Sequence, residues 1–181
     1  MSTFFVLLLA HLLGDFPLQT NRIFRMKLAS KRGLSLHIAI HVVTAAVLIE
    51  SWWQHWVLLL VYAVVHFLTD YIKIRLQEPG KPLTVGFIWD QIAHVVAIAG
   101  FAWWQPNIQS ILPPWVVIIA VFLAIFPAVM MLMWVWANDH YIEQRSISSN
   151  VEWISKKLLP ISQRFGWGIM IALFLFGIIF N

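Results

Sequence analysis

The sequence predicts an all-α protein, a polytopic bundle of about six transmembrane helices of which four surround a shared His/Asp site. Of 181 residues, 61% are hydrophobic and only 11% are charged, whereas soluble domains are about one quarter charged. Histidine and aspartate pairs recur with the same spacing in four consecutive apolar stretches. Cysteine is absent from the sequence, which excludes disulfides and thiolate metal sites.

Six stretches approach the roughly 20 apolar residues that a membrane span needs. They are residues 2–20, 34–53, 55–76, 85–104, 115–137 and 165–180. Gly14 and Pro17 interrupt the first stretch, and proline tends to kink a helix. This stretch lacks the basic start of a signal peptide, so we interpret it as a retained first helix. We expect a single integral membrane domain over residues 1–181.

The distribution of basic residues orients the predicted bundle. With six spans, all twelve Lys and Arg residues fall on the side opposite the two termini or at its membrane edge. Cytoplasmic loops carry an excess of these residues, so we expect this side to face the cytoplasm. The predicted location is the bacterial inner membrane, with several passes and with both termini in the periplasm.

The predicted domain has two parts. Residues 1–104 form a four-helix core around the site, and residues 105–181 supply two further spans. These two spans buttress the core or make a homo-oligomer contact. Between them, the polar segment 139–164 is expected to lie along the cytoplasmic membrane surface as a short helix.

Eight ionisable residues lie inside the first four predicted spans, and such residues usually face the bundle interior and mark function. The pairs are His11 and Asp15, His37 and His41, His66 and Asp70, and Asp90 and His94. Each pair is spaced i, i+4, which places both side chains on one helix face. Because successive helices run in opposite directions, all four pairs fall at a similar depth near the cytoplasmic face.

Five imidazoles and three carboxylates suit one or two metal ions, with the remaining groups orienting the ligands. Mixed nitrogen and oxygen ligands favour a divalent transition metal, Zn first, with Fe or Mn as alternatives. Gln19 and Gln91 lie beside the pairs and are expected to support the ligands through hydrogen bonds. A metal-free proton relay and simple hydrogen bonds between helices are the competing interpretations.

Three segments, HLLGDFPLQT, HIAIH and HFLTDYIK, carry a resemblance to a known family. They resemble a bacterial membrane-protein family catalogued as a domain of unknown function, whose members often sit beside SatD-like proteins. The resemblance covers about residues 1–100. The matching positions are His11, Asp15, Phe16, Gln19, His37, His41, His66, Asp70, Asp90 and His94. The family's function is unassigned, so the resemblance supports the site and implies no reaction.

The pattern predicts a membrane-embedded, metal-dependent hydrolase that acts from the cytoplasmic leaflet on a membrane-associated lipid or lipid-linked phosphate. A bound ion would activate water, and Asp15 or Asp70 is the expected general base. Arg22, Lys73 and Arg75 lie at the mouth of the site, where they anchor the helices at headgroup level or bind a phosphate-bearing headgroup.

Three other functions stay open at this point. They are a metal-ion transporter or sensor, a proton-coupled transporter that uses the His/Asp cluster, and redox chemistry at a di-iron centre. A transporter needs a polar route to the periplasmic side, and the predicted spans offer mostly apolar residues there. The HExxH motif of membrane metalloproteases is absent. Loop basicity is expected in any such protein and gives no sign of nucleic-acid binding.

Overall fold

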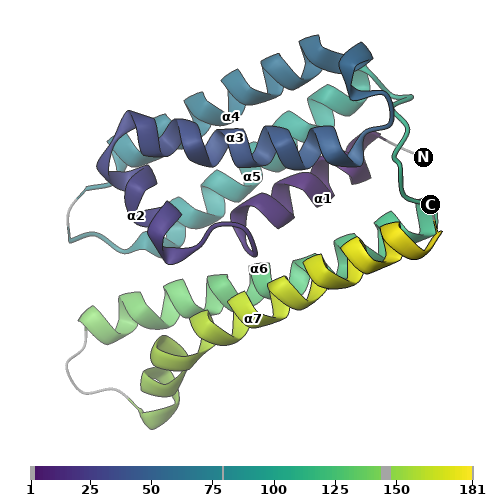
Figure 1. Cartoon of the computed structure of the whole chain (residues 1–181). Coiled ribbons are helices and arrows are strands. Elements are labelled where there is room, and N and C mark those ends of the chain that lie inside the picture. Colours follow the sequence, from purple (N-terminus) through teal and green to yellow (C-terminus); the bar gives the residue numbers. More distant parts are fainter. Residues whose placement is uncertain (1–2, 79, 144–147, 181) are drawn as a thin grey trace.

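The structure is an assembly of helices. A computed structural model describes residues 3–78, 80–143 and 148–180, and within these ranges it has seven α-helices and one 3-10 helix, η1. They are α1 (Thr3–Asp15), α2 (Asn21–Ala29), α3 (Lys31–Leu48), η1 (Trp52–His55), α4 (Trp56–Leu76), α5 (Leu83–Trp104), α6 (Pro114–Glu143) and α7 (Ser149–Phe180). Figure 1 shows α6 and α7 packed beside the part formed by α1 to α5. The predicted all-α class is confirmed.

Five helical stretches in the described part are long and apolar enough to cross a membrane. They are Lys31–Leu48, Trp52–Leu76, Leu83–Trp104, Pro114–Tyr141 and Ser149–Gly177. α1 is also apolar, but its 13 residues extend about 20 Å at 1.5 Å per residue, less than a hydrocarbon core of about 30 Å. The predicted bundle of membrane-spanning helices is confirmed, with a first helix shorter than expected.

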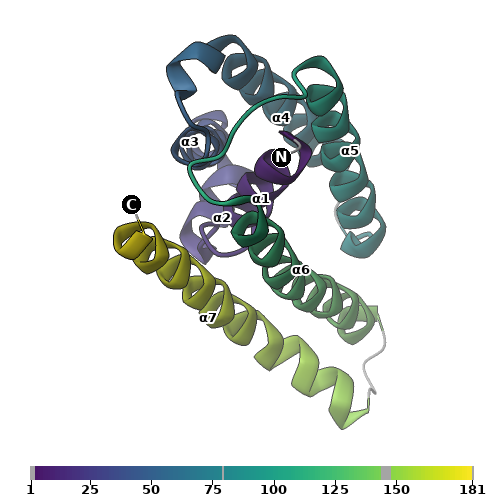
Figure 2. The same ribbon diagram turned by 90° about the vertical axis from the view of Figure 1, so that its right-hand side faces the viewer.

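α1 is the central helix of the bundle. Figure 2 shows it between α3 and α5, with α6 also beside it. Val6, Leu7, Leu9 and Ala10 are fully buried. α1 ends at Asp15 because Pro17 lacks an N–H group and disfavours helical geometry in the residue before it. Since the other helices enclose α1, its length does not have to match the thickness of the bilayer.

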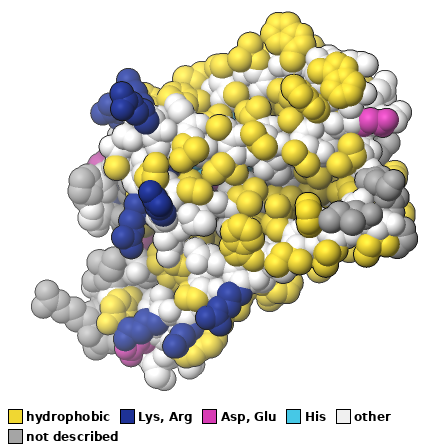
Figure 3. Space-filling model, viewed as in Figure 1, with side chains coloured by type: hydrophobic (Ala, Val, Ile, Leu, Met, Phe, Trp, Pro, Cys, Tyr) yellow, Lys and Arg dark blue, Asp and Glu magenta, His cyan; other side chains and the backbone are white. Residues whose placement is uncertain are grey.

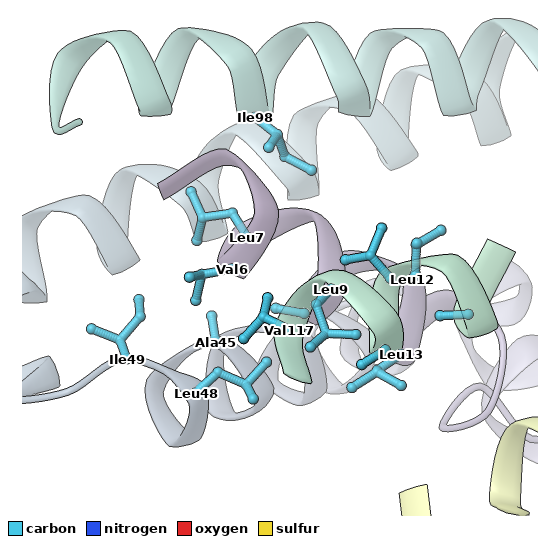
Figure 4. Packing of buried hydrophobic residues seen from close by; sticks show 14 of the residues in the cluster. Val6, Leu7, Leu9, Leu12, Leu13, Ala45, Leu48, Ile49, Ile98 and Val117 are labelled. Atoms are coloured by element: carbon cyan, nitrogen blue, oxygen red, sulfur yellow. The ribbon is translucent and has the colours of Figure 1, made fainter. Parts of the chain in front are cut away.

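The apolar core fills the half of the bundle that contains the start of α1. Figure 4 shows its packing, with contributions from Leu7, Leu9, Ala45, Leu48, Ile98 and Val117. α3 and α5 end at this level, whereas α4 and α6 begin there. Much of the core therefore lies toward the end of the bundle away from α2, while Leu12, Leu13 and Phe16 continue it along α1.

α2 is a short helix in the segment between the predicted spans 2–20 and 34–53, where no helix is expected from the sequence. Thr20 accepts a hydrogen bond from the backbone N of Ile23 at 3.4 Å and so caps α2. Ser30 ends α2 and caps α3 by accepting from the backbone N of Gly33 at 3.0 Å. A Cβ at Gly33 would lie 1.9 Å from the carbonyl O of Met26. Glycine at this position lets α2 fold back tightly against the start of α3.

α6 and α7 form a long helical pair. Ser162 Oγ donates to the carbonyl O of Pro127 at 3.0 Å, and Trp134 Nε1 donates to the carbonyl O of Ser155 at 2.7 Å. Residues 139–143 complete α6 and residues 149–164 belong to α7, while residues 144–147 lie outside the described residues. The expected separate surface helix over 139–164 is therefore replaced, where described, by the extended ends of the last two helices.

Basic side chains are unevenly distributed over the surface. Figure 3 shows Lys and Arg at the end of the molecule where α2 lies and along part of α7, with some Asp or Glu among them, while the opposite end of this face shows an acidic side chain and no Lys or Arg. Arg145 is the predicted loop cation that falls outside the described residues. This asymmetry has the form that the sequence predicts, with the positive charges gathered toward one end of the bundle.

Candidate metal centre

The structure brings all eight predicted His and Asp side chains together in one buried cluster. They come from α1, α3, α4 and α5, two from each helix. Each of the eight residues is at most 7% exposed, and His37 and His41 are fully buried. The i, i+4 spacing aims both members of a pair inward, and the alternating helix directions bring the pairs to one level.

Four of these residues form a compact group of metal-ligand type. One ligand atom each from His11, Asp15, His41 and His66 lies within 4.8 Å of all the others. Within this group, His41 Nε2 is 3.2 Å from Asp15 Oδ1. Tetrahedral zinc with bonds of 2.0–2.1 Å separates its ligand atoms by about 3.3 Å. Three nitrogens and one oxygen are the ligand types that such an ion binds, and the atoms that are farthest apart would have to approach one another by up to about 1.5 Å.

Glycine makes room for this group. A Cβ at Gly14 would lie 2.4–2.7 Å from three atoms of the His41 ring. In the sequence, Gly14 is notable only as an interruption of the first helix. The structure shows that it lets an imidazole of α3 lie directly against α1, where it reaches Asp15.

Two further groups adjoin the first. His37, His66 and Asp70 form one, and Asp70, Asp90 and His94 form the other. Lysine already balances their carboxylates. Lys27 Nζ lies 2.8 Å from Asp70 Oδ2, and Lys73 Nζ lies 2.6 Å from Asp90 Oδ2. In the described part of the chain, the side chains that make polar contacts with Asp15 are those of His11, His37, His41 and Gln91.

The charge of the cluster limits the number of divalent ions that it could hold. Three ionised Asp side chains and two protonated Lys side chains leave the cluster, with neutral histidines, at a net charge of −1. One divalent ion changes this to +1, and two ions change it to +3. Unbalanced charge inside a membrane bundle is costly. This charge count disfavours two ions, and Asp15 is the carboxylate for which the described residues provide no lysine partner.

Several buried atoms of the cluster lack a hydrogen-bond partner in the described part of the chain. In His94 the hydrogen bonding fixes the position of the ring proton. Its Nδ1 donates to the backbone carbonyl O of Asp90 at 2.8 Å. The carbonyl fixes the proton on Nδ1 and leaves a lone pair on Nε2, which is buried without a partner. A histidine oriented in this way is typical of metal sites. The other such nitrogens are His11 Nδ1 and both ring nitrogens of His37 and His66.

Gln91 supports the cluster from α5. Its Nε2 donates to Asp15 Oδ2 at 3.1 Å and to Asp90 Oδ2 at 3.3 Å, and its Oε1 lies 3.2 Å from His11 Nε2. These contacts are the kind expected for a residue that orients ligands. Gln19 differs, since its buried Oε1 has no hydrogen-bond partner among the described residues. The structure therefore gives Gln19 no link to the ligands.

Two of the basic residues pair with carboxylates of the cluster, which the sequence did not predict. Lys27, expected only as a loop charge, is 7% exposed and pairs with Asp70. Lys73, expected at the headgroups, pairs with Asp90 instead. Arg75 Nε donates to Tyr71 Oη at 3.2 Å, and Arg22 lies exposed on α2. The capping residues Thr20 and Ser30 are the sequence signal that could have indicated α2.

Comparison with known proteins gives a family but no function. No curated protein and no solved structure matches the chain. A family model described as "Protein of unknown function (DUF3307)" matches residues 3–119. The match extends beyond the resemblance over residues 1–100, and it includes the four His/Asp pairs, Lys27 and Gln91. Because the model covers well over half of the 181 residues, the chain belongs to the DUF3307 family of proteins of unknown function.

Proposed function

We propose that this protein is a membrane-embedded, metal-dependent hydrolase that acts on a membrane-associated lipid or lipid-linked phosphate. The observation that carries the proposal is the buried group of His11, Asp15, His41 and His66, with ligand atoms within 4.8 Å of one another. One divalent transition metal is the cofactor, Zn first, with Fe or Mn as alternatives. Lysine pairs at Asp70 and Asp90 balance the rest of the cluster.

The residues around the ion have separate tasks in this proposal. A bound divalent ion would supply Lewis acidity, which lowers the pKa of a coordinated water and polarises the bond to be broken. Asp15 is a ligand, so Asp70 is the better general base. Asp70 Oδ2 lies 3.4 Å from His37 Nε2 and 3.6 Å from His66 Nε2. Asp70 would take the proton of the attacking water and return it to the leaving oxygen as the ester bond breaks.

The apolar core supports hydrolysis over transport. Between the cluster and the end of the bundle away from α2, the buried side chains include Leu7, Ala45, Leu58 and Ile98, each at most 1% exposed. Thr44 is polar, but its Oγ1 donates to the carbonyl O of Ile40 in its own helix at 2.7 Å. An ion that left the cluster in this direction would meet few ligands.

The orientation of the protein forms part of the proposal. Basic side chains gather at the end of the bundle where α2 lies (Figure 3), and the start of α1 and the end of α7 lie at the other end (Figure 1). By the positive-inside rule, we place the α2 end at the cytoplasmic face of a bacterial inner membrane. The cluster would then lie toward the cytoplasmic leaflet, from which substrates would approach, and both termini would be periplasmic.

Product formation from natural lipids tests the hydrolase. Purified metal-loaded protein is incubated with vesicles of bacterial polar lipid extract, and the released products are identified by mass spectrometry. We expect metal-dependent release that is lost in His41→Ala and Asp70→Asn. His55→Ala is the matched control, because His55 contacts Gln105 outside the cluster, with Nδ1 and Oε1 3.1 Å apart. Lack of any product from folded, metal-loaded protein, or equal release after chelation, would contradict the proposal.

A further inference from the structure

The structure assigns a phosphate-binding site to a basic pocket beside the metal cluster, between α2, the start of α3 and the end of α4. This inference rests on the proposed function and deepens it by naming the substrate class, a phosphate monoester carried on a lipid. The pocket has a volume of about 370 Å³ and is lined in part by Lys27, Lys31 and Arg75. None of its lining residues is acidic. We call it the Lys27 pocket.

One aromatic ring holds two of the three cations in place. Lys31 Nζ lies 5.7 Å and Arg75 Cζ lies 5.2 Å from the centre of the Tyr71 ring. Arg75 Nε also donates to Tyr71 Oη at 3.2 Å. Tyr71 itself lines the pocket. The two cations are therefore positioned before any ligand binds, which reduces the entropy lost on binding.

Lys27 connects the pocket to the metal cluster. Its side chain is 7% exposed and lines the pocket, while its Nζ lies 2.8 Å from Asp70 Oδ2. A ligand that contacts Lys27 therefore lies next to the carboxylate that we propose as general base. The position suits a substrate whose phosphate is recognised in the pocket, beside Asp70 and the cluster.

The charge of the pocket matches a phosphate monoester. Such a group carries about −1.5 to −2 at pH 7, and ammonium and guanidinium groups are its usual partners in proteins. Lys27 is largely occupied by Asp70, which leaves Lys31 and Arg75, both exposed, to balance the dianion. A single carboxylate would leave one of these two cations without a partner.

Apolar side chains beside the pocket favour a lipid as the source of the phosphate. Leu34 and Ile74 line the pocket together with Leu28, and Leu28 is 52% exposed. Phe24, on the same short helix, is 42% exposed. In a membrane, exposed apolar groups at the end of the bundle lie among lipid chains. A phosphate group held in the pocket would then have its acyl or polyprenyl chain beside α2.

Binding to metal-free protein tests this pocket apart from the hydrolase. The full chain in uncharged maltoside micelles, treated with chelator, is titrated by calorimetry with dihexanoyl phosphatidic acid and with inorganic phosphate. We expect saturable binding of the lipid, and weaker binding of inorganic phosphate. Equal or tighter binding of inorganic phosphate would support the phosphate site but assign it to the free anion.

Single substitutions identify the residues that bind the phosphate group of these probes. Lys31→Gln and Arg75→Gln are each expected to weaken binding about tenfold, the loss of one charge-assisted hydrogen bond. Arg25→Gln is the matched control, because Arg25 is exposed on α2 and does not line the pocket; it should change binding less than about twofold.

Two results would overturn the assignment. One is the absence of saturable binding of either probe to protein with wild-type circular dichroism. The other is equal weakening by Arg25→Gln and Lys31→Gln, which would mean that general surface charge attracts the anion. Neither result bears on metal content or lipid hydrolysis, which are measured on metal-loaded protein. A result that contradicts the phosphate-binding assignment can therefore be distinguished from one that contradicts the proposed hydrolase activity.

Discussion

Lys27 Nζ lies 2.8 Å from Asp70 Oδ2, and both side chains are almost completely buried. The pair joins α2, a helix too short to cross a membrane, to α4 at the centre of the His/Asp cluster. It thus has two effects. It balances one of the three carboxylates, and it fixes α2 over the end of the bundle where the Lys27 pocket lies.

Breaking the Lys27–Asp70 pair should destabilise the protein. Lys27→Met leaves the carboxylate of Asp70 buried without its cation, and loss of one partner of a buried pair costs about 3–5 kcal/mol. Thermal denaturation in detergent, followed by circular dichroism, should show a lower Tm. The double variant Lys27→Met with Asp70→Asn should recover part of the loss. Arg25→Met, at an exposed position of α2, should leave the Tm nearly unchanged. A Tm for Lys27→Met equal to that of wild type would contradict the buried pair.

Gly14→Ala should weaken metal binding without unfolding the protein. The added Cβ would lie 2.4 Å from the His41 ring, so the ring must move away from Asp15. We expect about tenfold or greater loss of metal affinity, measured by competition with a fluorescent chelator. Gly100→Ala on α5 is the control, because a Cβ there meets nothing within 4 Å. Equal affinities for the two variants would show that His41 is not a ligand.

Gln91→Leu should also reduce metal affinity, for a different reason. The variant keeps the volume of the side chain but removes the hydrogen bonds to Asp15 and His11. Loss of a residue that orients ligands typically costs 10–100-fold in affinity, and we expect about that range here. Gln54→Leu in the exposed η1 is the control. Unchanged affinity in Gln91→Leu would remove Gln91 from the metal site.

The apolar core predicts that the protein does not carry metal across a membrane. Proteoliposomes that contain a zinc-sensitive dye should take up Zn no faster than liposomes without protein, since Leu7, Leu58 and Ile98 occupy the route. Uptake that saturates with Zn and disappears in His41→Ala would favour the transporter over the hydrolase. The flux assay needs no knowledge of the substrate, so it separates the two functions independently.

The sequence alone predicts the meeting of the four His/Asp pairs, because two simple rules govern it. Residues four apart share a helix face, and consecutive membrane helices alternate in direction. These rules place His11 and His66 at the same level, and the structure brings them close enough to bind the same metal ion. Similar reasoning places Gln91 beside the cluster, where it contacts Asp15.

Other features depend on tertiary contacts that no local pattern shows. Lys27 is buried only because Gly33 lets α2 fold against α3, and its sequence neighbourhood resembles an ordinary basic loop. Residues 149–164 are polar enough to predict a surface helix. They continue α7 instead, tied to α6 through Trp134 and Ser162. The Lys27 pocket is formed by residues of α2, α3 and α4 together. The pattern of any one helix therefore does not predict it.

The metal content of the purified protein tests the central claim most directly. Wild type, His41→Ala and the control His55→Ala are purified in detergent without added metal, checked for folding by circular dichroism and analysed by inductively coupled plasma mass spectrometry. We predict about one equivalent of a single divalent transition metal in wild type and His55→Ala, and little in His41→Ala. Two equivalents would contradict the charge balance, and no stoichiometric metal in folded wild-type protein would contradict the metal centre itself.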